Sequence, residues 1–365
     1  MAEPATATLT VDLDALAHNY AVLGREARGA EVAPMVKSDG YGLGAAPIAR
    51  RLWAEGARTF FVARLAEGEA LRAALGPGRP GRIAVLDGLT PGAAPRLAAA
   101  DLTPVLTSLA QIAEAGAFAT ETGRPLDVIL HVDTGMNRQG LTLEEARAVA
   151  LSTDRLKGLE VTLVMSHLGS GDEPGNPRNA RQLAGFLEIR ALFPRARASL
   201  SASAGVFLGP DYRFDLVRPG VSLYGGGPEG TPDPRLKAVA TLTAPILDLR
   251  HLKPGDVVGY GESVRIDRPT RAAVAGVGYS DGVIRAARAG GGCVWFAGAR
   301  RRLLAVNMDI LIFDLGDAPA QIDERVEIVG PNALIDDLAA AAGTVAYEVL
   351  VRLSRRAERV YLGEA

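Results

Sequence analysis

Lys37 has the side chain with the clearest capacity for covalent chemistry. It follows the apolar run V-A-P-M-V and precedes the glycine-rich segment S-D-G-Y-G-L-G. If that run is a strand of a parallel barrel, it ends at the face where the loops leave the packed interior, so the lysine points into the mouth of the barrel. Its amine is then a candidate for a Schiff base with a carbonyl group.

Polar residues also follow the ends of later strand-like runs. They are Arg138 in D-T-G-M-N-R, His167 in V-M-S-H, Ser203 in S-L-S-A-S and Arg218 in R-P-G. Phosphate groups in such barrels often bind after strands seven and eight, so Ser203 and Gly220 form a candidate anion site. The sequence has no G-x-x-x-x-G-K-[ST] loop, no H-E-x-x-H motif and no Cys/His cluster, which argues against nucleoside triphosphate and zinc sites. A lysine, a phosphate site and no metal motif together indicate a phosphorylated cofactor that forms an imine.

The elements that must position these residues alternate between about residues 32 and 225. Short apolar runs rich in β-branched residues are separated by Ala/Leu/Arg/Glu stretches of helical period, which predicts βα units around a parallel sheet. The eight strand-like runs are VAPMVKS, TFFVAR, RIAVLDG, LTPVLTS, LDVILHVD, LEVTLVMSHL, ARASLSAS and FDLVRPGVSLYG. Eight strands close a (β/α)8 barrel of the TIM type, with a doubly wound open sheet as the alternative.

A second, mostly β domain is predicted after about residue 235, because the strand-like runs there are joined by Gly/Pro/Asp turns. One helix, ALIDDLAAAAG, precedes two final expected strands, AYEVLVRLS and RVYLG. The opening ATLTVDL is also strand-like and could join this domain. We therefore expect an N-terminal strand over 1–10 that packs with the β domain, a barrel over 11–234 and a β domain over 235–365.

Composition narrows the class of protein. Of the 365 residues, 48% are hydrophobic and 22% charged, which is typical of a folded globular chain. The formal net charge of −2 argues against a nucleic-acid partner. The single Cys293 suits a reducing compartment, and Asp12 and Asp14 interrupt any N-terminal apolar run, so we expect a cytoplasmic protein without a membrane segment.

Six motifs, in this order along the chain, resemble those of the alanine racemases, which are fold-type III enzymes dependent on pyridoxal phosphate. They are V-K-S-D-G-Y-G-L-G, D-T-G-M-N-R, R-P-G-V-S-L-Y-G, G-Y-S-D-G, V-N-M-D and A-Y-E-V. The resemblance covers nearly the whole chain. It implies racemisation of L- and D-alanine, which supplies D-alanine for peptidoglycan or L-alanine for catabolism.

The resemblance also implies a role for each site residue. Lys37 would bind the cofactor covalently and act as one catalytic base, and Tyr279 would be the other base. Arg218 would face the pyridine nitrogen and Arg138 the phenolic oxygen, with His167 near Arg218 and Tyr279. The positions expected around the phosphate are Tyr41, Ser203, Gly220, Val221 and Tyr347. Arg138, Met308 and Asp309 would line the substrate side, and no metal is expected.

Two bases are chemically necessary, because racemisation removes a proton from one face of a planar intermediate and delivers one to the other. Lysine and tyrosine both have an ordinary pKa near 10, so each pKa must be lowered by its surroundings, and neighbouring positive charge lowers both. Arg218 and His167 are the expected sources of that charge. His131 stands where many family members have a lysine, carbamylated in some, so Arg138 must be supported in another way.

The resemblance further implies a homodimer, because in this family the tyrosine base and the methionine come from the partner subunit. Two alternatives keep the cofactor: a racemase of serine, lysine or arginine, or a fold-type III amino-acid decarboxylase. Tyr279 argues against the decarboxylase, since those enzymes usually carry a cysteine-containing element in the second domain. A carrier of the cofactor without turnover is a third alternative, which the presence of the β domain disfavours.

Overall fold

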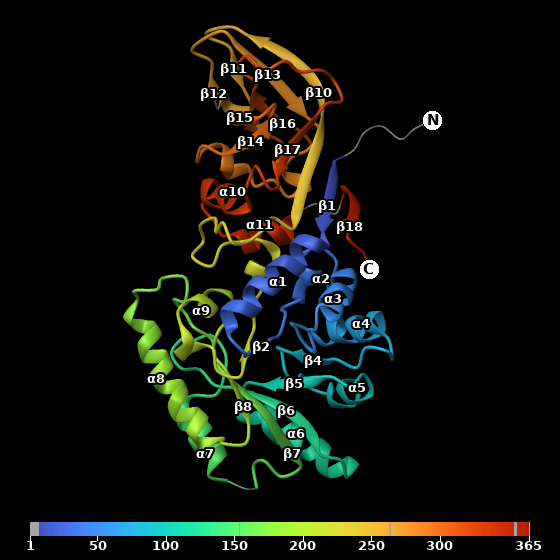
Figure 1. Ribbon diagram of the computed structural model, residues 1–365, viewed down its shortest axis with the longest axis vertical. Helices are drawn as coiled ribbons and strands as arrows, with labels where there is room; N and C mark the ends of the chain where they lie inside the picture. Colours follow the sequence, from blue (N-terminus) through green and yellow to red (C-terminus); the bar gives the residue numbers. More distant parts are fainter. Residues whose placement is uncertain (1–6, 153, 263, 354–355, 365) are drawn as a thin grey trace. The chain divides into compact units, whose positions relative to one another are not determined.

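The computed structural model describes residues 7–152, 154–262, 264–353 and 356–364, which form two compact units (Figure 1). The barrel unit comprises 20–40 and 44–223. The β unit comprises the described residues of 1–19, 41–43 and 224–365. The short segment 41–43, directly after the turn that follows Lys37, therefore belongs to the β unit.

Eight short parallel strands follow one another around the described part of the barrel unit. They are β2 (Glu31–Val32), β3 (Thr59–Val62), β4 (Arg82–Val85), β5 (Thr103–Leu106), β6 (Leu126–His131), β7 (Leu159–Met165), β8 (Arg197–Ser199) and β9 (Leu216–Val217). Strands β3 to β8 form one sheet in sequence order, and β2 pairs with β9.

Backbone hydrogen bonds close this ring on both sides of the β2–β9 pair. The amide of Val36 donates to the carbonyl of Phe61 over 2.9 Å, which joins the β2 segment to β3. The amide of Arg218 donates to the carbonyl of Ser201 over 2.8 Å, which joins β9 to the end of β8. The predicted eight-stranded barrel is thus confirmed, and the doubly wound open sheet is wrong.

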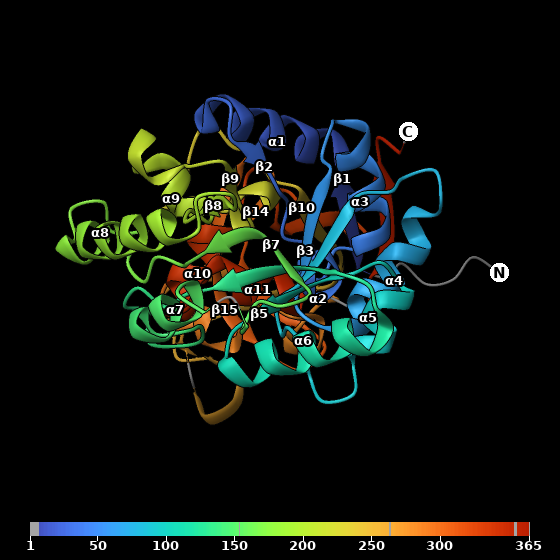
Figure 2. The ribbon, with the colours of Figure 1, turned by 90° about the horizontal axis from the view of Figure 1, so that it is seen from below.

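Helices surround the ring, as Figure 2 shows for α3 to α8. Their bounds are α3 (Ala45–Ala54), α4 (Leu65–Leu75), α5 (Ala94–Ala99), α6 (Leu109–Thr122), α7 (Leu143–Ala150), α8 (Pro177–Leu192) and α9 (Ser203–Phe207). The remaining helical segments that touch this unit are α1 (Leu13–Ala27), α2 (Lys37–Tyr41), η1 (Pro210–Tyr212) and η2 (Val221–Tyr224). Local sequence sets several starts: Ser108 caps α6 by accepting from the amide of Gln111, and Thr142 and Glu145 form a capping box at α7.

The β unit contains a second closed sheet within its described residues. The strands of this unit are β1 (Thr8–Asp12), β10 (Ala240–Leu252), β11 (Val257–Val258), β12 (Val264–Arg265), β13 (Thr270–Ala275), β14 (Cys293–Phe296), β15 (Ala299–Val306), β16 (Leu311–Asp314), β17 (Arg325–Val329) and β18 (Glu358–Leu362). Strands β11 and β12 form a separate two-stranded sheet. In the strand order β13-β16-β15-β14-β17-β10-β1-β18, the first six strands form a closed ring because β13 also pairs with β10, and β1 and β18 continue the sheet beyond β10. An irregularity between Ile246 and Asp248 lets the long β10 pair with β1 and β17 along its first half and with β13 along its second.

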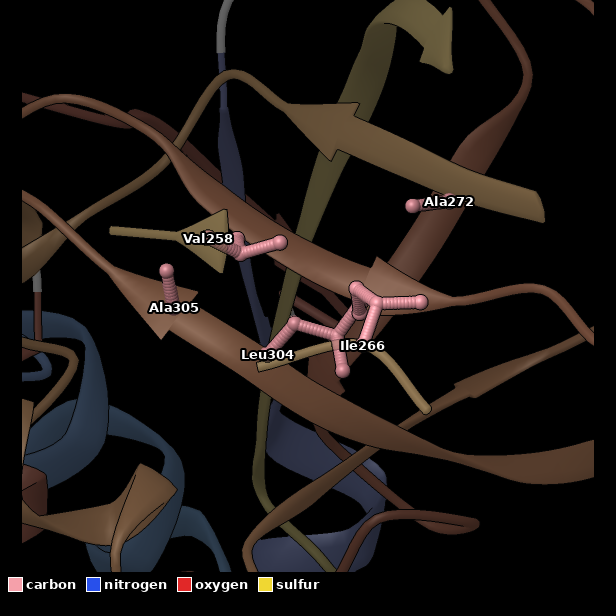
Figure 3. Packing of buried hydrophobic residues seen from close by; sticks show 5 residues of the cluster. All are labelled: Val258, Ile266, Ala272, Leu304 and Ala305. Carbon is pink, nitrogen blue, oxygen red and sulfur yellow. The ribbon is translucent and has the colours of Figure 1, made fainter. Parts of the chain in front are cut away.

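An apolar cluster packs between the segment that carries β11 and β12 and the strands β13 and β15. Figure 3 shows Val258, Ile266 and Leu304 pointing into a common space, with Ala272 and Ala305 at its edges. Each of these five side chains is buried. The closed sheet therefore gives the strand-like runs after residue 235 a core of their own.

Two sequence expectations need correction. The run AYEVLVRLS forms a helix, α11 (Ala346–Arg352), because its buried residues Ala346, Val349 and Leu350 have helical spacing despite the β-branched composition. The first barrel strand is also shorter than expected, since regular pairing in β2 ends at Val32, two residues before Pro34.

The other helical elements of the β unit are α10 (Ile335–Ala342), which matches the expected helix, η3 (Tyr260–Glu262), η4 (Tyr279–Asp281) and η5 (Arg285–Arg288). Across the described ranges, no helix is both long enough and apolar enough to span a membrane.

Candidate active site

Lys37 lies at the start of a left-handed turn in the barrel unit. Ser38, Asp39 and Gly40 have φ angles of 54°, 55° and 62°, a conformation that costs energy for residues with a Cβ. The amide of Gly40 donates to the carbonyl of Val36 over 2.9 Å, and the amide of Ala45 donates to Asp39 Oδ1 over 2.9 Å. These contacts fix the backbone that carries the half-buried lysine.

Burial and the nearby guanidinium of Arg138 lower the pKa of the Lys37 amine. The carboxylates of Glu67 and Asp87 act in the opposite direction and raise it. The net direction is downward, so a larger share of the amine is neutral near physiological pH. A neutral amine is the form that attacks a carbonyl or accepts a proton.

Arg218 is 1% exposed and directly follows β9. Its Nη1 donates to the carbonyl of Ser199 over 3.0 Å and also to that residue's hydroxyl, while Nη2 donates to the carbonyl of Ser166 over 2.5 Å. Nε is fully enclosed and has no partner among the described residues. Burial and Arg138 lower the pKa of the guanidinium to about 9, so it remains cationic at neutral pH with one donor available.

Both histidines near Arg218 are neutral. Burial, Arg218 and Arg138 lower the pKa of His131, at the end of β6, to about 4. The same three causes lower the pKa of His167 well below its usual range. The expectation that His167 contributes positive charge is therefore wrong, because the arginines already hold the charge of this region. The mutual influence of these groups and Lys37 shows that they lie close together in the barrel unit.

The loop that carries Arg138 folds around one carboxylate. Asp133 Oδ1 accepts from the amides of Gly135 and Met136 over 2.7 and 2.8 Å, and Oδ2 accepts from the amide of Arg138 over 3.2 Å. This arrangement holds the loop without a carbamylated lysine. Asp133 thus supports Arg138 although His131 stands where many family members have a lysine, because it fixes the backbone from which the guanidinium extends.

Ser203 and the R-P-G segment meet at the end of the barrel, as expected from the sequence. Ser203 is 1% exposed, and its Oγ accepts from the amides of Gly220 and Ser222 over 2.9 and 3.3 Å. The amides of Ser203 and Val221 donate to no acceptor within the part of the chain that the structure describes. Two free amides beside a hydroxyl are suited to an anion such as a phosphate group.

Tyr41 and Tyr347 lie together in the β unit. Tyr41 is 5% exposed and stacks on Tyr224, with 4.7 Å between ring centroids, and its ring lies 6.2 Å from that of Tyr347. Burial, reinforced by Tyr347, raises the pKa of the Tyr41 hydroxyl, so it stays protonated. Gly42 permits this packing, since a Cβ there would lie 3.1 Å from the carbonyl oxygen of Leu350 in α11.

Tyr279, Met308 and Asp309 occupy two adjoining turns of the β unit. The amide of Tyr279 donates to the carbonyl of Asn307 over 2.9 Å, and that of Ser280 donates to the carbonyl of Met308 over 3.0 Å. Tyr279 is 43% exposed and Met308 53% exposed. Both side chains are therefore accessible to solvent in the single chain.

A network below these turns escaped the sequence reasoning. The buried carboxylate of Asp281 receives Nε and Nη2 of Arg356, each over 2.9 Å, and Arg356 Nη1 donates to Asp309 Oδ1 over 2.7 Å. Asp281 Oδ2 also accepts from the amide of Gly278. One arginine therefore ties together the turns of Tyr279 and Met308. The sequence offered Asp281 in the G-Y-S-D-G motif as a signal for this network. Nothing near it in the sequence indicated that its partner is Arg356.

The site residues expected from the sequence thus fall into two sets. Lys37, Arg138, His167, Ser203, Arg218, Gly220 and Val221 belong to the barrel unit, whereas Tyr41, Tyr279, Met308, Asp309 and Tyr347 belong to the β unit. Sequence reasoning also missed Tyr224 and Glu67. Glu67 was detectable only as the N3 residue of a helix start, which by itself carries no functional meaning.

Two family models match successive parts of the chain. The family model described as "Alanine racemase, N-terminal domain" matches residues 11–228, and "Alanine racemase, C-terminal domain" matches 239–361. A protein of Mesorhizobium japonicum named "Alanine racemase, catabolic" is 42% identical, over 98% of this chain and 94% of its own length. A protein of Agrobacterium fabrum named "Alanine racemase, biosynthetic" is 41% identical, over 99% and 95%.

Solved structures give the same result. The alanine racemase of Bartonella henselae, described as containing covalently bound pyridoxal phosphate, superposes with a TM-score of 0.92 at 34% identity, covering 98% of this chain and 100% of that one. Matches of this extent cover both units and every motif noted above. The chain belongs to the alanine racemase family.

Proposed function

We propose that this protein is an alanine racemase that interconverts L- and D-alanine with pyridoxal phosphate as its cofactor. The single observation that carries the proposal is the fully buried Arg218, whose Nε has no partner among the described residues and whose guanidinium, like the Lys37 amine, lies close enough to lower the pKa of His167. A buried donor without a partner is costly unless a ligand completes it. Full-length relatives named alanine racemase support the assignment over a decarboxylase or another racemase.

The residues present fit this cofactor. Lys37 would hold it covalently, Arg218 would donate to the pyridine ring through Nε, and the free amides of Ser203 and Val221 would bind the phosphate with the hydroxyl of Ser203. Gly220, Tyr41 and Tyr347 would complete the phosphate site, and Arg138 and His167 would border the ring. When bound, pyridoxal phosphate supplies the electron sink that acidifies the α-hydrogen of an amino acid.

Two side chains move the proton in this proposal. Lys37 Nζ, whose pKa is lowered by burial and by the charge of Arg138, accepts or delivers a proton on one face of the substrate. The hydroxyl oxygen of Tyr279 does the same on the other face. Arg218 keeps a positive charge near the pyridine nitrogen, which disfavours a proton there and limits side reactions such as transamination. Met308, Asp309 and Arg138 would contact the substrate.

A homodimer would bring the two sets of residues together. Tyr279 and Met308 are exposed in the single chain, so in this proposal a second copy of the chain supplies them to the barrel unit of the first. We further propose a cytoplasmic enzyme with domain boundaries near residues 10 and 234. Catabolic and biosynthetic relatives match almost equally well, so D-alanine for peptidoglycan and L-alanine for catabolism remain equally supported products.

Spectroscopy and optical activity test the function together. The purified protein should absorb between about 300 and 500 nm through its cofactor, and the circular dichroism of L-alanine should decay to zero in its presence. Lys37→Ala should remove both signals, whereas Lys157→Ala, at an exposed lysine of the same unit, should change neither. Tyr279→Phe should keep the absorbance and lose racemisation, with Tyr212→Phe as the control. Cofactor absorbance without any decay of L-alanine would contradict the proposal, and L-serine measured in parallel defines the substrate range.

Mixing the two inactive variants tests the shared site. Random dimers of Lys37→Ala and Tyr279→Phe chains are half heterodimers, and each heterodimer holds one site with both bases intact. The mixture should therefore recover about one quarter of wild-type activity. A site formed within one chain predicts no recovery, although both variants fold and dimerise.

A further inference from the structure

Glu67 connects helix α4 to the turn that follows Lys37. Its Oε1 accepts from the amide of Ser38 over 2.8 Å. Its Oε2 accepts from the amides of Ala63 and Arg64 over 2.8 and 3.2 Å. Both carboxylate oxygens are thus engaged by charge-assisted hydrogen bonds, one set at the end of β3 and the other directly beside the lysine.

The hydrogen bond at Ser38 acts on strained backbone. Ser38 and Asp39 adopt left-handed φ angles of 54° and 55°, and Tyr41 follows with 56°. Such residues keep this conformation only where their surroundings hold them. Because the Glu67 contact is at the first left-handed residue, it helps to fix where the turn begins and so the direction in which the Lys37 side chain extends.

Charged groups of both signs surround Lys37. The groups that act on Lys37 are Arg138 from the loop after β6, Glu67 from α4 and Asp87 from the segment after β4, and Lys37 in turn acts on His167 at the end of β7. Asp87 is paired with Arg64, Nη1 to Oδ2 over 3.2 Å, whereas Glu67 forms no ion pair with any described residue. Among the described residues, Glu67 is therefore held by hydrogen bonds from backbone amides and not by an ion pair.

We propose that Glu67 is a positioning residue for Lys37, which fixes the turn after the lysine and places a negative charge near its nitrogen. The inference rests on the proposed function, because a lysine that binds the cofactor and moves a proton must be held in one position and one charge state. It explains why a helix-capping residue also reaches across to a neighbouring strand end. Removing the charge should favour the unprotonated Lys37 nitrogen.

Three variants separate charge from geometry. Glu67→Gln keeps the size and removes the charge. Glu67→Asp keeps the charge and shortens the reach to Ser38. Glu69→Gln is the matched control, because Glu69 lies on the same helix and pairs with Arg96 over 2.6 Å without contacting the turn. Circular dichroism of each purified holoenzyme establishes that the variants fold.

The decisive readout is the absorbance of each holoenzyme between about 300 and 500 nm as a function of pH, which follows protonation of the Lys37 nitrogen. We expect the midpoint to move to lower pH in Glu67→Gln and to stay unchanged in Glu69→Gln. The part of the kcat/KM profile that changes with protonation of the Lys37 nitrogen should also move to lower pH. We also expect kcat to fall about tenfold or more in Glu67→Gln and Glu67→Asp and to stay within about twofold in the control.

Each outcome decides the proposal. A Glu67→Gln enzyme that follows the wild-type absorbance curve at every pH overturns it, whether activity is kept or lost, because a purely structural role would leave the curve in place. Failure of the proposed function has a different signature, namely racemisation that survives in Lys37→Ala. The two results are therefore distinguishable in one set of purified proteins.

Discussion

Replacing Arg356 by alanine tests the network beneath Tyr279. The substitution leaves the Asp281 carboxylate, whose side chain is 4% exposed, with only the amide of Gly278 as a donor. It removes two hydrogen bonds of 2.9 Å to Asp281 and one of 2.7 Å to Asp309. The turns that carry Tyr279 and Met308 then remain joined mainly through their backbone.

The cost follows from the burial of the two partners. Removing one member of a buried ion pair costs about 3–5 kcal/mol. Arg356 is itself 52% exposed, so solvent screening reduces this figure and we expect a loss of about 2–3 kcal/mol in the free energy of unfolding. With an unfolding entropy of about 2.1 cal/mol/K per residue, the midpoint of thermal unfolding falls by roughly 3 °C if the chain unfolds as one unit.

Urea denaturation followed by circular dichroism measures this loss. Arg300→Ala is the matched control, because Arg300 pairs with Asp337 in the same unit over 2.9 Å and that carboxylate is 33% exposed. Its loss should stay within about 0.5 kcal/mol. In kinetics, Arg356→Ala should lower kcat about tenfold or more while the cofactor absorbance stays unchanged, because the loosened turn misplaces Tyr279. Equal stability of the two variants, with kcat intact, would refute this reasoning.

Two further predictions concern pH and packing. Because the pKa of His131 is lowered to about 4 in the folded chain from about 6.5 in the unfolded chain, the unfolded state binds more protons in this window, and stability falls as pH drops through it. In urea titrations at about pH 7.5 and 5, wild type should lose about 2 kcal/mol more stability than His131→Gln, because the buried His167 contributes its own loss in both proteins. An identical loss in both proteins would contradict the assignment. Gly278→Ala would bring a Cβ to 2.4 Å from the carbonyl oxygens of Asn307 and Met308, so we expect a loss of about 1–3 kcal/mol and of most activity. Gly175→Ala, where a Cβ meets open space, should match wild type in both measurements.

The spacing of apolar residues was sufficient to predict the barrel, because buried parallel strands are continuous apolar runs whereas the helices that cover them are apolar on one face only. TFFV is buried at every position, as expected for a strand covered on both faces. The same reasoning failed for AYEVLVRLS, since a segment of seven to nine residues with V-L-V at its centre fits both periods. The segment is helical because Ala346, Val349 and Leu350 pack into the core from one helix face, and amino-acid composition does not contain that information.

The site divides in a similar way. Lys37, Ser203 and Arg218 were accessible from the sequence because each directly follows a predicted strand, and strand ends converge in a barrel. Glu67 and Arg356 were not, because each acts through partners that only the folded chain brings close. The charge state of His167 also needed the structure, since it depends on how many arginines share its surroundings.

The placement of β1 has a consequence for synthesis of the chain. Leu9 and Val11 in β1 are fully buried between two strands that are made much later, β10 beginning at Ala240 and β18 at Glu358. At about 5–20 residues per second, β1 waits roughly 20–70 s on the ribosome before its second neighbour exists. During this interval an apolar strand has both edges open, although the barrel that follows it can already close. The final residues of the chain therefore end the period in which its first strand is most exposed to aggregation and chaperone binding.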